Sequence, residues 1–301
     1  MRQKKMSDDN QHIGMAVKTA PRRKVSQTGF FLMFRGAALI NAFALVIVVF
    51  FLVKNGWQAI NWTFLTEVPT DSMTKGGIFP CIVGTVYLSI GAMLFAFPLG
   101  VASAIYLNEY ARQGALMRAI RFGINNLAGV PSIVFGLFGL AFFVTWMKLE
   151  VSILSGALTL GILSLPVIIG TSEEALRAVP DTYREASLGL GATKWQTISR
   201  VVMPAALPSM ITGGILALSR AAGETAAIMF TAAVYYTTQM PSSIFDPVMA
   251  LPYHIYVLAT AGTNIEQTRG LQYGTALVLI ALVLGMNLIA IIYRARLRRK
   301  R

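Results

Sequence analysis

Residues 76–108 read GGIFPCIVGTVYLSIGAMLFAFPLGVASAIYLN and contain no Asp, Glu, Lys or Arg. A helix needs roughly 20 apolar residues to cross a hydrocarbon core about 30 Å thick, so this run is long enough to span a membrane. As a continuous helix rising about 1.5 Å per residue it would be roughly 50 Å long, which exceeds the thickness of a bilayer. We therefore expect a membrane-spanning helix here, kinked at Pro98.

Similar apolar runs lie on both sides of this stretch. Of the 301 residues 55% are hydrophobic and only 13% are charged, which is more apolar side chain than one soluble core could bury. Backbone polar groups in lipid must pair within their own segment, so each run is expected to be a helix, with Pro131 and Pro166 kinking or capping two of them. The sequence predicts an all-α polytopic membrane protein with six transmembrane helices, at about 36–53, 78–107, 123–146, 151–171, 209–234 and 271–293.

The net charge of +13 is distributed unevenly among the segments between these helices. The tails 1–35 and 294–301 and the loops 112–121 and 173–208 together hold 21 Lys and Arg, and the alternate segments hold four. Since Lys and Arg accumulate in cytoplasmic segments, both termini and the loop 173–208 are expected in the cytoplasm. The partner that this charge implies is membrane lipid, not nucleic acid.

Two other interpretations are less consistent with this topology. Separate helices at 201–219 and 225–245 would add a seventh crossing and expel the basic C-terminal tail. The N-terminal tail is basic and polar, and no small-residue cleavage site follows the apolar run that ends at Val53. We therefore expect six spans and an N-terminus that is not removed as a signal peptide.

Few residues are suited to catalysis or to metal binding. One cysteine, Cys81, and two histidines, His12 and His254, are too few for an internal disulfide or a histidine metal site. The sequence contains no glycine-rich nucleotide-binding loop, metalloprotease motif or hydrolase motif. We therefore expect a chain that is not an enzyme, with no catalytic residues and no metal or cofactor of its own. Any ATP that drives it must bind to another chain.

The segment 235–269 is the longest loop expected on the external side. It carries MALPYHIY, residues 249–256, an apolar stretch with two open interpretations. The stretch either rests among lipid headgroups or forms a docking surface for an external protein.

The cytoplasmic loop 173–208 carries signals for two short helices. Asp181 is expected to cap the first helix and Thr193 the second, since both side chains can accept hydrogen bonds from free backbone N–H groups. Gly191 allows a sharp turn between them. A helix, a glycine turn and a second helix would form a compact protrusion.

The same loop resembles a motif of the permease subunits of ABC importers. Ser187, Val201 and Met203 replace Ala, Ile and Leu of that motif, and each replacement is conservative in size or polarity. The spacing Glu185-Ala186-Ser187, three residues, Gly191, nine residues, Val201, one residue, Met203-Pro204 is similar to the family pattern E-A-A-x3-G-x9-I-x-L-P.

This resemblance implies a fold and a set of partners. The fold would be that of a type I (MetI-like) ABC importer permease, with residues 36–293 as the permease domain and 173–208 as the coupling loop. A second homologous permease subunit and two ATPase subunits, which bind ATP and Mg²⁺, would complete the complex. The residues of the loop that would couple to an ATPase are Glu185, Ala186, Gly191, Thr193 and Pro204.

Two charged residues, Arg220 and Glu224, interrupt the fifth predicted helix. Arg220 lies eleven residues past Ser209, roughly 16 Å deep at about 1.5 Å per residue and therefore near the membrane midplane. An unpaired charge there costs about 2.5–3.5 kcal/mol or more, so we expect these side chains, four residues apart on one helix face, to pair. The planar donors of arginine suit a tetrahedral oxyanion, and a purely structural ion pair is the alternative.

The sequence around these charges resembles the phosphate-specific branch of the same permease family. The segments ALSRAAGETA, residues 217–226, and GVPSIVFG, residues 129–136, carry the resemblance, which is closer to the PstA-type subunit than to its PstC-type partner. It implies import of inorganic phosphate from an external phosphate-binding protein, with Arg220, Glu224 and Ser132 along the substrate pathway. A permease for another oxyanion such as sulfate or molybdate, or an ion-driven secondary anion carrier, is the alternative.

Overall fold

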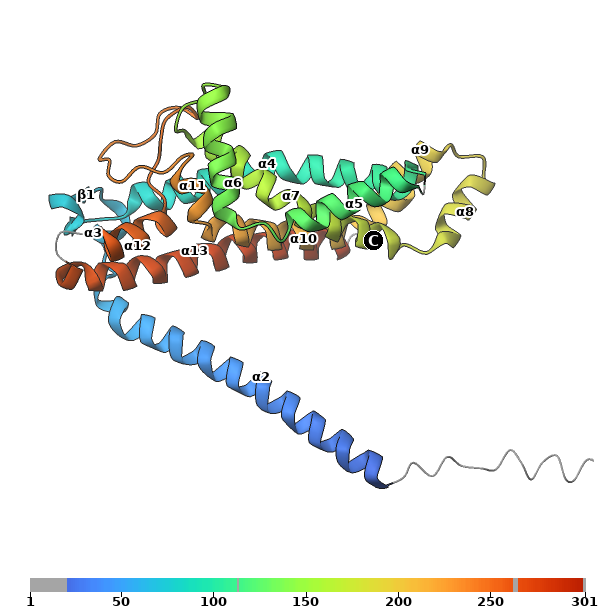
Figure 1. Ribbon diagram of the computed structural model, residues 1–301, viewed down its shortest axis with the longest axis horizontal. Helices are drawn as coiled ribbons and strands as arrows, with labels where there is room; N and C mark the ends of the chain where they lie inside the picture. Colours follow the sequence, from blue (N-terminus) through green and yellow to red (C-terminus); the bar gives the residue numbers. More distant parts are fainter. Residues whose placement is uncertain (1–20, 113, 262–264, 300–301) are drawn as a thin grey trace, which may run out of the picture. The chain divides into compact units, whose positions relative to one another are not determined.

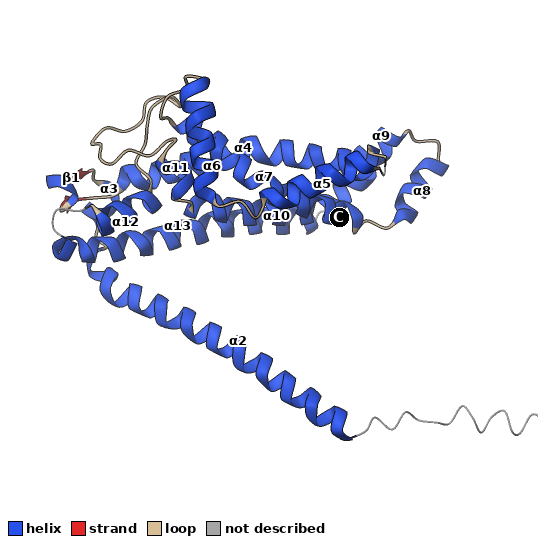
Figure 2. Cartoon of the chain, viewed as in Figure 1, coloured by secondary structure: helices blue, strands red, loops and turns tan. Residues whose placement is uncertain are grey.

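The structure is a computed structural model that describes residues 21–112, 114–261 and 265–299 (Figure 1). It is almost entirely helical, as Figure 2 shows, apart from two short strands and the connecting loops. The chain forms two compact units, one up to Phe51 and one from Leu52 onward.

Helix α2 (Pro21–Gly56) begins well before the first predicted span, 36–53. Its start lies inside the segment 1–35 that we expected to be a polar tail, and residues 1–20 of that tail lie outside the described residues. The apolar side chains of α2 from Phe30 to Phe51, which lie in the first unit, are exposed. A helix with this surface suits an apolar environment.

The number of membrane spans agrees with the sequence prediction. Among the described residues, five helices are long and apolar enough to cross a membrane, and a bent pair of helices brings the number to six when the pair is counted as one span. The five helices are Phe30–Ala59, Phe79–Tyr110, Ile153–Arg177, Lys194–Gly223 and Thr268–Arg296, and the bent pair is Ala115–Leu127 with Ser132–Trp146.

Helices α4 (Phe79–Ile105) and α7 (Ile153–Arg177) pack against each other at the centre of the second unit. Helix α10 (Met203–Gly223) packs on α7, and α13 (Ile265–Arg299) packs on α10. Small residues allow these approaches, since lipid provides no hydrophobic force between apolar helices and close van der Waals contact must hold them together. Pro166 lies within α7, which continues through it.

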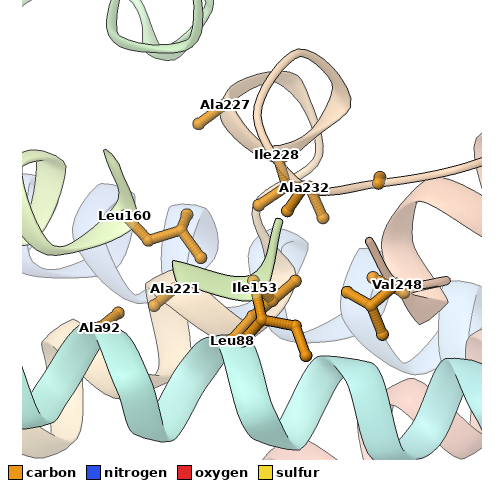
Figure 3. Packing of buried hydrophobic residues seen from close by; sticks show 11 residues of the cluster. Leu88, Ala92, Ile153, Leu160, Ala221, Ala227, Ile228, Ala232 and Val248 are labelled. Atoms are coloured by element: carbon orange, nitrogen blue, oxygen red, sulfur yellow. The ribbon is translucent and has the colours of Figure 1, made fainter. Parts of the chain in front are cut away.

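One cluster of this core surrounds the end of α10. Figure 3 shows Leu88 and Ala92 of α4 packed with Leu160 of α7, Ala221 of α10 and Ile228 of the short helix α11 (Ala226–Met229). All five side chains are nearly inaccessible. The middle of α4 therefore lies beside the point where α10 ends.

The third span is bent. Helix α5 (Ala115–Leu127) and helix α6 (Ser132–Gly139), which continues as the π-helix η4 (Leu140–Trp146), meet at 102°. Pro131 is the N-cap of α6 and has no N–H to donate to the preceding turn. The expectation that Pro131 kinks or caps this span is confirmed.

The short elements near the first loop lie at one end of the second unit, and α8 and α9 lie at the other (Figure 1). The two strands pair antiparallel, with Pro69 opposite Gly76 and Thr70 opposite Lys75. The elements at this end are η1 (Trp57–Ala59), α3 (Trp62–Thr66), β1 (Pro69–Thr70), η2 (Asp71–Met73), β2 (Lys75–Gly76) and α12 (Leu251–Thr260).

The apolar stretch 249–256 is part of the protein core. Met249 and Leu251 are almost fully buried and pack with Phe64 and Cys81. Both interpretations of this stretch, a headgroup contact and an external docking surface, are therefore wrong for most of its residues. Hydrophobicity alone does not distinguish a segment that faces lipid from one that the chain itself covers.

The segment between α11 and α12 is fixed by backbone hydrogen bonds to the start of α7. The N–H groups of Ile153 and Leu154 donate to the carbonyls of Asp246 and Ile244. The carboxylate of Asp246 accepts hydrogen bonds from Ser242 and from the N–H of Ser243, and these bonds lower the pKa of Asp246 below its usual value. The loop is thus ordered without a helix of its own.

Replacing Gly213 tests the close approach of α10 to α7. A Cβ at Gly213 would lie 2.6 Å from the Cβ of Thr171, so Gly213→Ala must push the two helices apart. Such overpacking costs about 1–3 kcal/mol, and the melting temperature of the purified protein should fall.

The matched control is Gly285→Ala on α13, where an added Cβ meets no atom within 4 Å. This variant should melt at or above the temperature of the wild type, because alanine stabilises a helix by about 1 kcal/mol relative to glycine. Equal melting of both variants would contradict the packing of α10 on α7.

Candidate functional site

The loop between α7 and α10 folds as two short helices around a glycine turn. Helix α8 (Asp181–Gly189) is followed by Gly191, whose φ of +83° lies in the left-handed region that favours glycine. Thr193 and Gln196 then form a capping box at the start of α9 (Lys194–Thr197), which continues through η5 (Ile198–Val202) into α10. The predicted turn at Gly191 and the predicted cap at Thr193 are confirmed.

The predicted cap at Asp181 is wrong. The N-cap of α8 is Pro180, and the carboxylate of Asp181 instead lies 3.1 Å from Nη1 of Arg184, one turn further along the helix. No side chain caps the start of α8, but an acidic residue in the first turn interacts favourably with the positive end of the helix. The start of α8 is therefore stabilised by the charge of Asp181 and not by a side-chain cap.

Arg184 attaches α8 to the rest of the second unit. Its Nη2 lies 2.8 Å from Oε1 of Glu109, which follows α4, and donates to the carbonyl of Leu176 in α7. Its Nη1 donates to the carbonyl of Val179. Because arginine presents its donors in a rigid plane, one side chain fixes α8 to two long helices at once.

Helices α8 and α9 are also joined to each other. The hydroxyls of Ser187 and Thr197 lie 2.9 Å apart. Ser187 is one of the residues at which the loop departs from the family pattern, and its hydroxyl makes a contact that alanine could not. The two short helices therefore behave as one folded protrusion.

The protrusion presents an exposed surface at its tip. Glu185, Ala186 and Gly191 are exposed, and Leu190 is 90% exposed although it is apolar. Pro204 is partly buried at the start of α10. Further large apolar side chains exposed on the protrusion are Tyr183, Leu188 and Trp195. An exposed apolar surface on a rigid element is typical of a protein interface.

The second candidate site lies where α10 ends. The helix stops at Gly223, short of the expected end at Val234, and Glu224 has an extended conformation with φ −76° and ψ 131°. Helix α11 follows but is only 4 residues long, so the chain does not cross the membrane again there. Gly223 has low helix propensity, and the contacts of α11 in the core favour the break.

Arg220 and Glu224 do not pair. Arg220 is in the last turn of α10 and is exposed, whereas Glu224 is partly buried beyond the helix end. No ion pair or hydrogen bond joins their side chains in the described structure. The expectation of a pair four residues apart is wrong because the helix that would bring them together ends between them.

Arg220 lies at mid-height of the bundle. Its neighbour Ala221 packs with Ala92, the midpoint of α4, and with Leu160 of α7 (Figure 3). Non-helical backbone and free charge at this depth are tolerated where they are covered by protein or face water. The exposed guanidinium and the broken helix therefore suit the wall of a hydrated pathway.

The bent third span meets this break through α6. A Cβ at Gly136 would lie 2.8 Å from the carbonyl oxygen of Ala226, so α6 and α11 are in backbone contact. Ser132 lies four residues before Gly136 on the same face of α6 and is partly buried. The structure thus brings the helix of Ser132 beside the break, although the Ser132 hydroxyl has no hydrogen bond to Arg220 or Glu224 among the described contacts.

Sequence reasoning missed Glu109 and Arg184. Glu109 is the first charged residue after the uncharged run 76–108, and a carboxylate at the end of a long apolar helix needs a cation or water. That signal could have identified Glu109, but not its partner 75 positions further along the chain. Within the described residues, no group of three or more His, Cys, Asp and Glu side chains could hold a metal ion.

Comparison with known proteins decides the family. Residues 96–301, which include both candidate sites, match the family described as binding-protein-dependent transport system inner membrane component. The chain belongs to this family. It is therefore a multi-pass permease of the inner membrane, and the predicted all-α importer permease fold is confirmed.

Two curated relatives cover nearly the whole permease. A probable ABC transporter permease protein YqgI of Bacillus subtilis is 36% identical over 269 residues, 86% of this chain and 91% of the relative. A phosphate transport system permease protein PstA 1 of Mycobacterium tuberculosis is 36% identical over 286 residues, 93% of this chain and 91% of the relative. Both relatives are described as transport permeases, which agrees with the expectation that this chain is not an enzyme.

A solved structure shares the fold. A chain of the methionine ABC transporter MetNI, in an inward-facing conformation, superposes with a TM-score of 0.60 at 18% identity and covers 72% of this chain and 94% of its own. At this level of identity the likeness concerns the fold alone.

Proposed function

We propose that this chain is the permease subunit of an ATP-driven importer of inorganic phosphate and forms half of the translocation pathway. The observation that carries the proposal is the 36% identity to a PstA phosphate permease over 93% of the chain. An ion-driven secondary carrier is not favoured, because the family is one of binding-protein-dependent transport systems.

The site at the end of α10 fits this substrate class. Phosphate is a tetrahedral oxyanion, and a guanidinium can donate two parallel hydrogen bonds to it. Arg220 is exposed at mid-height of the bundle and carries no partner that would have to be displaced in the described structure. The carboxylate of Glu224, four residues further along the chain, would limit how tightly an anion binds, so the anion can leave again.

The complex has four kinds of component in this proposal. A homologous permease forms the second wall of the pathway, and an external phosphate-binding protein delivers the anion. Two ATPase subunits, which bind ATP and Mg²⁺, dock on α8 through the exposed surface around Leu190. The end of the bundle that carries α8 then faces the cytoplasm. Both chain termini also lie on the cytoplasmic side, as the excess of Lys and Arg in these segments favours.

We propose phosphate, and not another oxyanion, as the substrate because a curated relative is described as a phosphate transport permease. A single arginine binds sulfate or molybdate through the same hydrogen bonds. Competition of labelled phosphate uptake by unlabelled sulfate and molybdate measures this preference, and uptake that sulfate suppresses as well as phosphate does would contradict it.

Replacing the arginine tests the pathway. Arg220→Gln removes the charge but leaves a shorter, polar side chain. Labelled phosphate uptake by the reconstituted complex should fall at least about tenfold, since a hydrogen bond to a charged group contributes about 1.5–3 kcal/mol.

Arg118→Gln is the matched control for this variant. Arg118 is exposed on α5 and makes no side-chain hydrogen bond or ion pair in the part of the chain that the structure describes. Uptake by this control should equal that of the wild type. Full uptake by Arg220→Gln in an assembled complex would rule out a role for the arginine in transport.

Replacing Leu190 tests the docking of the ATPase. Leu190→Glu introduces a carboxylate that would be buried without a partner in the interface, so copurification of the ATPase subunits should fall at least about tenfold. Leu116→Glu serves as the control, because Leu116 is 76% exposed on α5, outside the α8–α9 protrusion. Equal loss of the ATPase from both variants would argue against docking on α8.

A further inference from the structure

Helix α4 continues directly into a π-helix, η3 (Tyr106–Tyr110), in which the N–H of Ala111 donates to the carbonyl of Tyr106. π-Helical turns are rare and occur often at functional sites. Residues 107–110 of this turn, which we call the η3 hub, point in different directions around the helix axis. Each of them contacts a different helix.

A basic side chain makes each of these contacts. Arg121 of α5 donates to the carbonyl of Leu107 at 3.0 Å, and Arg177 of α7 donates to the amide oxygen of Asn108 at 3.4 Å. Arg184 of α8 donates to Glu109 at 2.8 Å, and the ammonium of Lys194 of α9 lies 4.9 Å from the centre of the Tyr110 ring. The η3 hub therefore connects both helices of the protrusion to two transmembrane segments.

Glu109 is the centre of this arrangement. It is the one carboxylate of the η3 hub, its side chain is 8% exposed, and it accepts from both Arg184 and the amide of Asn108. A buried carboxylate that lost its cation would be strongly unfavourable, so α8 and η3 must move together or the pair must break.

The polar contacts continue from the η3 hub to α5. Glu173 of α7 lies 3.3 Å from Arg177 and 3.5 Å from Arg121. The second of these contacts is loose, since Nε of Arg121 and Oε1 of Glu173 are buried without hydrogen-bond partners. A polar cavity of about 280 Å³ lined by these three side chains lies between α5 and α7, which leaves room for α5 to shift.

Helix α5 is connected along the chain to α6, which contacts α11 beside the end of α10. It is the first half of the bent span, and α6, its second half, touches α11 at the break beyond Arg220. A displacement of α8 can therefore reach the break through contacts that are all present in the structure.

We propose that the η3 hub transmits the displacement of α8 to α5 and that Glu109 is the positioning residue that couples the two. This inference rests on the proposed function, because it requires an ATPase that moves α8. The docking surface and the coupling contact are different residues, so they can be tested separately.

The central experiment compares Glu109→Gln, Arg184→Gln and the double variant in complexes reconstituted with the ATPase subunits. Three quantities are measured: copurification of the ATPase, ATP hydrolysis, and phosphate transported per ATP hydrolysed. In Glu109→Gln the ATPase should copurify as in the wild type, because the exposed surface of α8 is unchanged. Phosphate transported per ATP should fall about tenfold or more, because a tenfold change corresponds to the loss of about one hydrogen bond between charged groups.

The double variant shows whether Glu109 and Arg184 act through one shared contact or whether their replacement causes two independent losses of transport. If both residues act through the same contact, its loss should stay within about twofold of the worse single variant, because the losses are not additive. Glu109→Asp keeps the charge and should recover part of the coupling. Tyr110→Leu removes only the ring below Lys194 and should lower phosphate per ATP by about two- to fivefold, as expected for one exposed cation–π contact.

Glu174→Gln is the matched control. Glu174 is exposed on α7 beside the same cavity and has no side-chain partner in the described structure. Wild-type phosphate per ATP in Glu109→Gln, losses that add in the double variant, or loss of the ATPase from Glu109→Gln alone would each overturn the role of the η3 hub. Failure of the wild-type complex to transport phosphate would instead overturn the proposed function.

Discussion

Lipid does not hydrogen-bond, and this constraint organises the whole permease. Every backbone polar group at membrane depth must be paired within the protein or hydrated. Every charge there must be paired or face water, and it usually marks a functional site. The ion pairs of Arg121, Arg177 and Arg184 all gather at the end of the bundle that carries α8. The end of α10 differs from that end of the bundle, because a broken helix and the exposed guanidinium of Arg220 lie at mid-height.

The bent third span and the broken fifth span depend on each other. Pro131 ends the turn before α6, and Gly136 lets α6 touch the backbone of α11. In the coupling that we propose, the η3 hub connects this region to the protrusion by side-chain contacts, in addition to the chain that runs from α9 through η5 into α10.

Sequence reasoning recovers what local physics determines. The apolar runs predict six spans, the left-handed φ at Gly191 follows from the need for a turn, and Thr193 has the side chain of an N-cap. Sequence reasoning fails where contacts between residues far apart in the chain determine the structure. The end of α10 at Gly223 is stabilised by packing, so the pairing of Arg220 with Glu224 could not be ruled out beforehand. Met249 is buried by Phe64, which lies far away in the sequence, and Glu109 finds Arg184 only in the folded chain.

Access of water to the end of α10 is the property that most directly tests whether Arg220 lines a hydrated pathway. The natural Cys81 is buried, so a cysteine introduced by Gly223→Cys can be labelled selectively with a membrane-impermeant thiol reagent in the assembled, reconstituted complex. A hydrated pathway at the end of α10 predicts rapid labelling of that position, slowed by phosphate, and no labelling after Leu94→Cys on the exposed, apolar face of α4. Absence of labelling at position 223 in every nucleotide state, or labelling equal to that at position 94, would contradict it.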